Sequence, residues 1–204
     1  MIIELTGLSG VKIQSGDNII LFAPPSAKSE LRSSRAKADV AVLGKPGDVI
    51  NVEPRGEKLF TVDGPGEFEA GGIFVYCLPS PALGPAHSLL SRTAIEGMAI
   101  VHLGGLNTDL SARELELFEG ADILLVPVGG KDVLDAKAAK AIVEKIEPRV
   151  VIPMHASQKG VTTAYDDAQK FFKEMGASPQ PQERAKLVKK DLPMDTMEVL
   201  HIIP

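Results

Sequence analysis

The pattern of the chain changes near residue 105, and this change limits the folds open to it more than any other feature. Before residue 105, short runs of alternating or β-branched residues are separated by turn residues, which is typical of hairpins. After it, apolar strands alternate with amphipathic segments of helical length, which indicates βα units. No linker or repeat divides the chain, so we expect a single α/β domain over residues 1–204.

Individual elements follow from the same patterns. Strands are expected at residues 2–5, 11–14, 19–22, 38–43, 58–62, 72–78, 93–103, 121–128, 148–154 and 197–203. Helices are expected at residues 28–37, with Ser26 or Ser29 as a cap, and at 110–120, 135–146 and 165–175. Ser111 and Glu114 have the spacing of a capping box, which places the start of the second helix.

Composition excludes several classes of protein. The 22 basic and 27 acidic residues give a formal charge of -5 without a long run of either sign, which argues against a nucleic-acid or anionic-membrane surface. No apolar run is long enough for a transmembrane helix and no basic, apolar leader is visible, so we expect a cytoplasmic protein. The single cysteine, Cys77, excludes an internal disulfide and a thiolate-rich zinc site; its apolar surroundings predict a buried core residue.

Four stretches then point to a family through their order. They are "DGPGEFEAGGIFV" (63–75), "IVHLGGL" (100–106), "DILLVPVGG" (122–130) and "EPRVVIPMH" (147–155). In this order they resemble the compact branch of the metallo-β-lactamase superfamily, which is similar to the ascorbate-6-phosphate lactonases. The resemblance runs from the first hairpin to about His155. It implies a four-layer αββα sandwich with a metal site at one edge between the two sheets.

His155 follows a short β-branched strand that stops at Pro153, where α/β folds usually carry their chemistry. The resemblance implies a metal-binding histidine in this "PMH" context, but a hydrolytic metal centre needs several ligands around it. The family's His-x-His-x-Asp-His loop is replaced by "GKPGDVINV" (44–52), which leaves Lys45 near the first ligand position and Asp48 as an oxygen donor. Gly105 stands in place of the family's bridging aspartate.

The remaining candidates each have a structural and a functional interpretation. A third histidine ligand is expected after the "GPGEFEAGG" stretch, and His87 arrives late in a loop rich in proline and glycine. Asp63 and Glu67 are candidates for the cleft, although solvated loop carboxylates are commoner. His102 is expected to be a packed residue at a strand end, and His201 is expected on the exposed side of a terminal strand.

Two classes of function remain open. In the first, the protein is a degenerate member of the fold that holds no metal and acts as a binding or scaffolding protein. Its site would be the cleft formed by His155, Asp48, Asp63, Glu67, Lys45 and Gly105. In the second, it is a lactone or phosphoester hydrolase with a rearranged zinc or manganese site, built from His155 with His87, Asp48 or Asp63. The sequence favours the first, with an unidentified small molecule or protein as partner, and leaves a homo-oligomer open.

Overall fold

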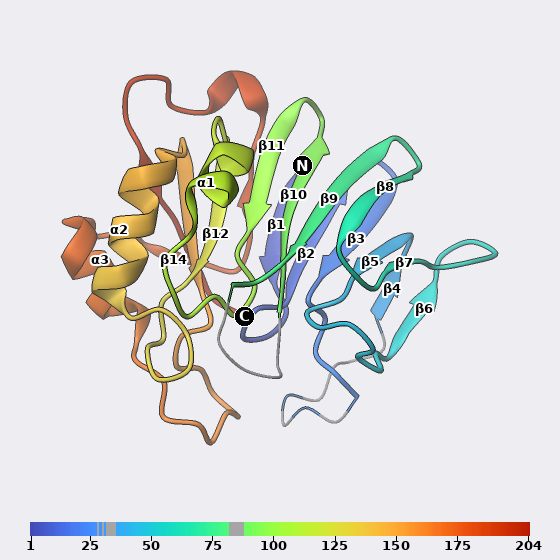
Figure 1. Cartoon of the computed structure of the whole chain (residues 1–204), viewed down its shortest axis with the longest axis horizontal. Helices are drawn as coiled ribbons and strands as arrows, with labels where there is room; N and C mark the ends of the chain where they lie inside the picture. The colour runs from blue at the N-terminus through green and yellow to red at the C-terminus, as the bar shows by residue number, and fades with distance from the viewer. Residues whose placement is uncertain (28, 30, 32–35, 82–87) are drawn as a thin grey trace.

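A computed structural model describes residues 1–27, 29, 31, 36–81 and 88–204 of the chain. Two mixed sheets pack face to face, and three α-helices lie together on the outer face of one of them (Figure 1). The predicted metallo-β-lactamase type of fold, two face-to-face mixed sheets with antiparallel hairpins and later βα units, is confirmed. In the described part of the chain, all three α-helices pack on the seven-stranded sheet, so of the four expected layers the described residues show three, αββ.

The six-stranded sheet takes five strands from residues 2–62 and one strand from residues 185–186. The strand order is β15-β1-β2-β3-β5-β7, antiparallel as far as β3 and parallel beyond it. A tight turn after Ser15 closes the β2–β3 hairpin, since Ser15 lies opposite Asn18 and Gly16 has a φ of 55°. The bounds are β1 Ile2–Leu5, β2 Val11–Ser15, β3 Asn18–Phe22, β5 Val40–Val42, β7 Phe60–Val62 and β15 Ala185–Lys186.

The seven-stranded sheet has the order β16-β13-β12-β11-β10-β9-β8. Its strands are antiparallel from β8 to β11 and parallel from β11 to β16, as the change near residue 105 predicts. The bounds are β8 Gly66–Ala70, β9 Ile73–Pro79, β10 Leu89–Ile95, β11 Met98–His102, β12 Ile123–Pro127, β13 Val150–Met154 and β16 Glu198–Val199. Two short pairs join β4 (Ala36–Ala38) to β6 (Val52–Pro54), and β14 (Pro181–Gln182) to β17 (His201–Ile202).

The helices are α1 (Ala112–Phe118), α2 (Ala136–Ile146) and α3 (Ala168–Met175). The predicted capping box starts α1: the Ser111 side chain accepts from the Glu114 N–H, and the Glu114 carboxylate accepts from the Ser111 N–H. The apolar faces of all three helices pack against strands of the seven-stranded sheet and form one hydrophobic cluster. None of the described helices combines the length and apolar character that crossing a membrane requires.

A second cluster fills the space between the two sheets. It takes alternate side chains from both inner faces, which is how face-to-face sheets build a core. Cys77 of β9 belongs to it and is 1% exposed, so the prediction of a core cysteine is confirmed. Burial raises the pKa of its thiol to about 12.

Three expectations about local structure are wrong. The stretch 93–103 is a hairpin, β10 to β11, because Glu96 and Gly97 both adopt positive φ and reverse the chain. Strand β4 occupies Ala36–Ala38, so no helix extends to Lys37; most of the predicted helix 28–37 lies outside the described residues. His201 is half-buried, and its ring lies 4.9 Å from that of Phe172, because β17 pairs with β14 beside α3.

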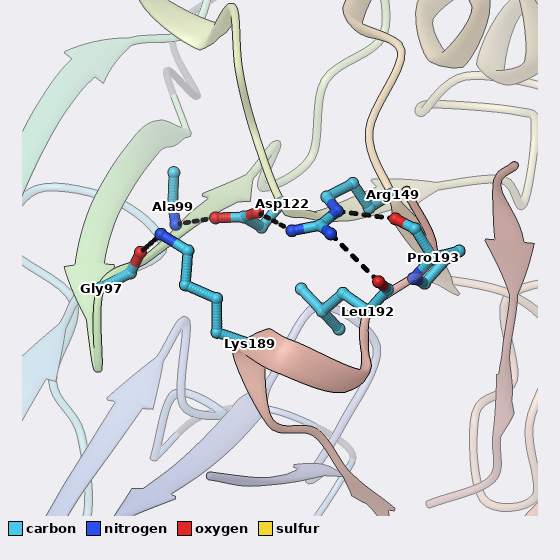
Figure 2. A network of polar contacts seen from close by, with 7 residues as sticks. All are labelled: Gly97, Ala99, Asp122, Arg149, Lys189, Leu192 and Pro193. Carbon is cyan, nitrogen blue, oxygen red and sulfur yellow. Dashed lines mark hydrogen bonds and ion pairs between the residues drawn. The ribbon is translucent and has the colours of Figure 1, made fainter. Parts of the chain in front are cut away.

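Residues 187–193 form a strap that polar contacts hold against the residues just before β11 and β13 (Figure 2). Arg149, just before β13, donates to the carbonyl oxygens of Leu192 (3.0 Å) and Pro193 (2.7 Å) and pairs with Asp122 (3.1 Å). Asp122 also accepts from the Ala99 N–H at 2.9 Å. Lys189 completes the attachment by donating to the Gly97 carbonyl oxygen. The strap is therefore bound directly at two points of the seven-stranded sheet, just before β11 and just before β13.

Candidate functional site

A cleft of about 300 Å³ lies where loops of both sheets meet. His155 enters it from the end of β13, while the other lining residues come from loops after β1, β3, β5 and β11 and from Ser88. Leu8, Ala23, Pro24, Pro25 and Leu31 make much of its wall apolar. The cleft is thus an edge site between the sheets.

The structure brings four of the predicted site residues together and leaves the others apart. His155, Lys45, Asp48 and Gly105 line the cleft. Asp63 and Glu67 are not among its lining residues and are exposed. Glu67 lies on β8, where Phe68 and Ala70 turn inward to the core, so the strand's alternation directs Glu67 outward. His87 lies outside the described residues.

The backbone of His155 is held in an unusual conformation. Its φ is 55°, a left-handed value that non-glycine residues adopt rarely and often at functional sites. Its N–H donates to the Leu8 carbonyl oxygen at 2.6 Å, which joins the end of β13 to the loop after β1. Behind it, a Cβ atom at Gly129 would lie 2.1 Å from the His155 carbonyl oxygen. Gly129 therefore permits a close approach between the loop after β12 and the backbone of His155.

Among the described residues, the imidazole of His155 has one polar partner. Its Nδ1 lies 2.6 Å from the hydroxyl oxygen of Ser9, and the ring packs edge-on to Tyr165 at 4.8 Å. Its Nε2 is buried and has no hydrogen-bond partner among the described residues. Burial lowers the pKa of His155 to about 4, with an opposing effect from Asp132 and a further lowering from Lys45. At neutral pH the ring is uncharged.

His102 fixes the backbone of Ser9. The prediction of a packed strand-end residue is confirmed, because His102 is 3% exposed and stacks on Phe22. Its Nδ1 accepts from the Gly104 N–H at 3.2 Å, so its Nε2 carries the proton that is donated to the Ser9 carbonyl oxygen at 2.8 Å. Burial lowers the pKa of His102 to about 4, which keeps this neutral form.

Ser9 is the site residue that the sequence did not reveal. Ser9 and His155 are 146 positions apart, so no local spacing links them. The available signal was the "GLSG" turn, residues 7–10, at the place where the resemblance implies a Gly-His pair. A polar residue in that turn is a reasonable candidate for the cleft once the fold is assumed.

Comparison with known families agrees with this architecture. The family model described as a beta-lactamase superfamily domain matches residues 3–155. The chain belongs to the β-lactamase superfamily. A UPF0173 protein of Pyrococcus furiosus is 40% identical over 82 residues, which cover 40% of this chain and 36% of that protein. A UPF0173 metal-dependent hydrolase of Pyrococcus abyssi is 29% identical over 133 residues, which cover 60% of this chain and 54% of the relative.

Solved structures of the superfamily share the fold. A Thermotoga maritima protein, named as a candidate Zn-dependent hydrolase of the metallo-β-lactamase superfamily, superposes with a TM-score of 0.82 at 21% identity and covers 99% of both chains. A metallo hydrolase of Ignicoccus hospitalis has a TM-score of 0.64 at 15% identity and covers 92% of this chain and 99% of its own. At these identities the likeness concerns the fold. The curated relatives match over about half of their own length or less.

The described cleft does not fit the metal centre that the superfamily implies. Among the described residues, no three histidine, cysteine, aspartate or glutamate side chains come together as a metal-binding group. Lys45 brings a positive charge, and Gly105 brings no ligand: a Cβ atom there would have no neighbour nearer than 3.8 Å. His155 and Asp48 are the described lining residues with metal-donor side chains, whereas a catalytic zinc takes about three protein ligands.

Proposed function

We propose that the cleft at His155 binds a small molecule with a largely apolar body and one polar group. The observation that carries the proposal is the buried Nε2 of His155, a polar atom without a hydrogen-bond partner among the described residues, on a residue that lines an otherwise largely apolar cleft. Buried polar atoms are usually satisfied, so an unpartnered one on a residue of the cleft wall calls for a partner, and we propose that a ligand in the cleft supplies it. A volume of about 300 Å³ is at the lower end for ligand sites.

The charges of the cleft narrow the chemistry of this ligand. Lys45 favours a ligand with an anionic or strongly accepting group, whereas Asp48 disfavours a second negative charge nearby. The imidazole of His155 is neutral at pH 7, so it contributes a hydrogen bond and no charge. Small carboxylates and their esters or lactones suit this combination better than polyanions.

A thermal-shift screen of small carboxylates, esters and lactones tests binding. A ligand present at about 100 times its Kd stabilises the folded state by about 2.7 kcal/mol. For a protein of this size, that raises Tm by roughly 5–11 °C. The shift should be lost in His155→Ala and reduced in Lys45→Met, while Lys140→Met, at a partly exposed helix position away from the cleft, keeps it. Ligands that raise Tm by the same amount in wild type and in all three variants would contradict the proposal.

A metal-dependent hydrolase is the second candidate, and a specific observation favours it. Relatives and structural neighbours are named as metal-dependent hydrolases, which supports this function better than a scaffolding role. His155 and Asp48 would be its described donors, and a further ligand would come from elsewhere, for example His87. We derive no metal-dependent step, because the described donors are too few.

Metal analysis decides between the two candidates. The protein is purified without chelators or an affinity tag, and zinc, manganese and iron are measured per chain. The ligand-binding candidate predicts substoichiometric metal in wild type and in His155→Ala alike. One metal per chain that is lost in His155→Ala, together with lactone or phosphoester hydrolysis that a chelator abolishes, would favour the hydrolase.

A further inference from the structure

We propose that Ser9 and His155 form a nucleophile–base pair that cleaves esters or lactones by acyl transfer to Ser9, without a metal. The inference rests on the ligand-binding cleft described above and goes beyond it by assigning a reaction. Both residues line that cleft and both are partly buried. Their side chains are the only hydroxyl–imidazole pair for which the described residues give a hydrogen bond.

The distance between the two groups is that of an activated nucleophile. A serine is a weak nucleophile alone, and a base within about 2.6–3.2 Å of its oxygen activates it. Ser9 Oγ lies 2.6 Å from His155 Nδ1 and 3.3 Å from the Gly104 carbonyl oxygen. The one hydroxyl proton can serve one of these acceptors, and the shorter contact is to the imidazole. In that arrangement Nδ1 is unprotonated and ready to accept the proton.

This tautomer also separates the inference from the metal-dependent candidate. A neutral imidazole that accepts at Nδ1 carries its proton on Nε2. A protonated Nε2 donates a hydrogen bond and does not bind a metal ion. The buried Nε2 of His155 would then donate to an acceptor on the ligand, which satisfies the unpartnered atom. The same contact orients a bound ester or lactone beside Ser9.

The surroundings hold the pair in place before any ligand binds. His102 anchors the Ser9 carbonyl oxygen, and the Leu8 carbonyl oxygen anchors the His155 N–H. Tyr165 packs against the edge of the imidazole and limits its rotation. Ser9 comes from the loop after β1 and His155 from the end of β13, so the pair forms only when the two sheets are packed together. Such preorganisation is what general-base catalysis requires.

The reaction balances with water as the second substrate. Ser9 Oγ bonds to the acyl carbon while its proton moves to His155 Nδ1. The acyl C–O bond then breaks, and the leaving alcohol takes that proton, which leaves an acyl-serine. Water repeats the sequence: its oxygen bonds to the acyl carbon, its proton moves through Nδ1 to Ser9 Oγ, and the acid is released. No oxidant, reductant or metal is consumed.

Charged neighbours act on this reaction in two ways. Lys45 lines the cleft and brings a positive charge that favours the anionic tetrahedral intermediate. Asp132 favours the imidazolium form of His155 that exists while the proton is transferred. Burial opposes that form, so we expect slow turnover with activated esters. General-base assistance typically accounts for about 10²–10⁴ in rate.

Covalent labelling of the untagged full chain in EDTA tests the inference. A fluorophosphonate probe is added, and the modified residue is identified by intact mass and peptide mapping. We expect one label per chain, on Ser9. The labelling rate should fall at least about 100-fold in His155→Ala, and Ser9→Ala should not be labelled. Ser157→Ala, at an exposed serine outside this cleft and two residues beyond His155, is the matched control and should label like wild type.

A second variant, Ser9→Cys, tests the pair even if Ser9→Ala does not fold. In Ser9→Cys, iodoacetamide should alkylate Cys at position 9 faster than in the double variant with His155→Ala, while buried Cys77 stays unmodified. If Ser9 is labelled as fast in His155→Ala as in wild type, His155 does not activate Ser9 and the inference is wrong. Absence of labelling, with ligand stabilisation retained in the thermal-shift assay, would overturn this inference and leave the proposed binding function standing.

Discussion

Gly129→Ala is the substitution for which the structure gives the sharpest expectation. The added Cβ atom would lie 2.1 Å from the carbonyl oxygen of His155, far inside van der Waals contact. The obstacle is a backbone atom, which cannot move away by changing a rotamer. His155 is already fixed by its bond to Leu8 and by its left-handed φ. The strain must therefore be relieved by shifting the ends of two adjacent strands, β12 and β13.

Overpacking typically costs about 1–3 kcal/mol, and a backbone obstacle places this variant at the upper end. A loss of about 3 kcal/mol lowers Tm by roughly 6–12 °C for a protein of this size. Calorimetry and urea unfolding of Gly129→Ala measure it, with Gly105→Ala as the control. Gly105 has no atom nearer than 3.8 Å to its added Cβ, so its unfolding free energy should change by less than about 1 kcal/mol.

If Gly129→Ala and Gly105→Ala lose the same amount of stability, the reasoning is wrong. Equal Tm values for wild type and Gly129→Ala would mean that the loop after β12 does not approach His155 as described. A large loss in Gly105→Ala would mean that the cleft has less room beside that position. Labelling of Ser9 should also fall in Gly129→Ala, because a shift of His155 lengthens its contact with Ser9.

Three other perturbations have expected outcomes. Phe118→Ala removes a fully buried ring from the helix-side cluster and should cost about 3–5 kcal/mol in urea unfolding, whereas a cost below 1 kcal/mol would contradict its packing. Arg149→Ala leaves Asp122 short of a partner and removes the two bonds from Arg149 to the strap, so it should lose about 1–3 kcal/mol and gain protease cleavage within 187–193. Lys140→Ala, which breaks only a partly exposed pair, should lose less than about 0.5 kcal/mol. Cys77, with its pKa raised to about 12, should react with a disulfide reagent at pH 8 only after unfolding, and rapid reaction of the folded protein would place it outside the core.

The fold could be predicted largely from sequence because its signals are local and repeated. β-branched runs, turn residues and the Ser111 capping box each define an element through neighbouring residues, and the order of four motifs identifies how they assemble. The errors occurred where local signals conflict. The stretch 93–103 is apolar enough for one strand, yet Gly97 permits the reversal that makes it a hairpin.

The site was predictable only in part, since tertiary packing creates it. His155 was predicted from its place after a strand end, and Lys45, Asp48 and Gly105 from the resemblance; all four line one cleft. Glu67 was also predicted from sequence as a cleft residue, but its side chain lies on the outward side of β8. Ser9 could not be found from spacing, because its contact with His155 depends on two loops from different sheets.

The place of β1 in its sheet affects how the chain is made. One edge of β1 pairs with β2, but the other pairs with β15, whose residues 185–186 are synthesised after all the other strands of that sheet. Until those residues leave the ribosome, β1 keeps a row of unpaired N–H and C=O groups beside an apolar core. A nascent or stalled chain that lacks β15 should therefore be prone to pair edge to edge with another copy and to need chaperone protection, although most of its core residues have already been made.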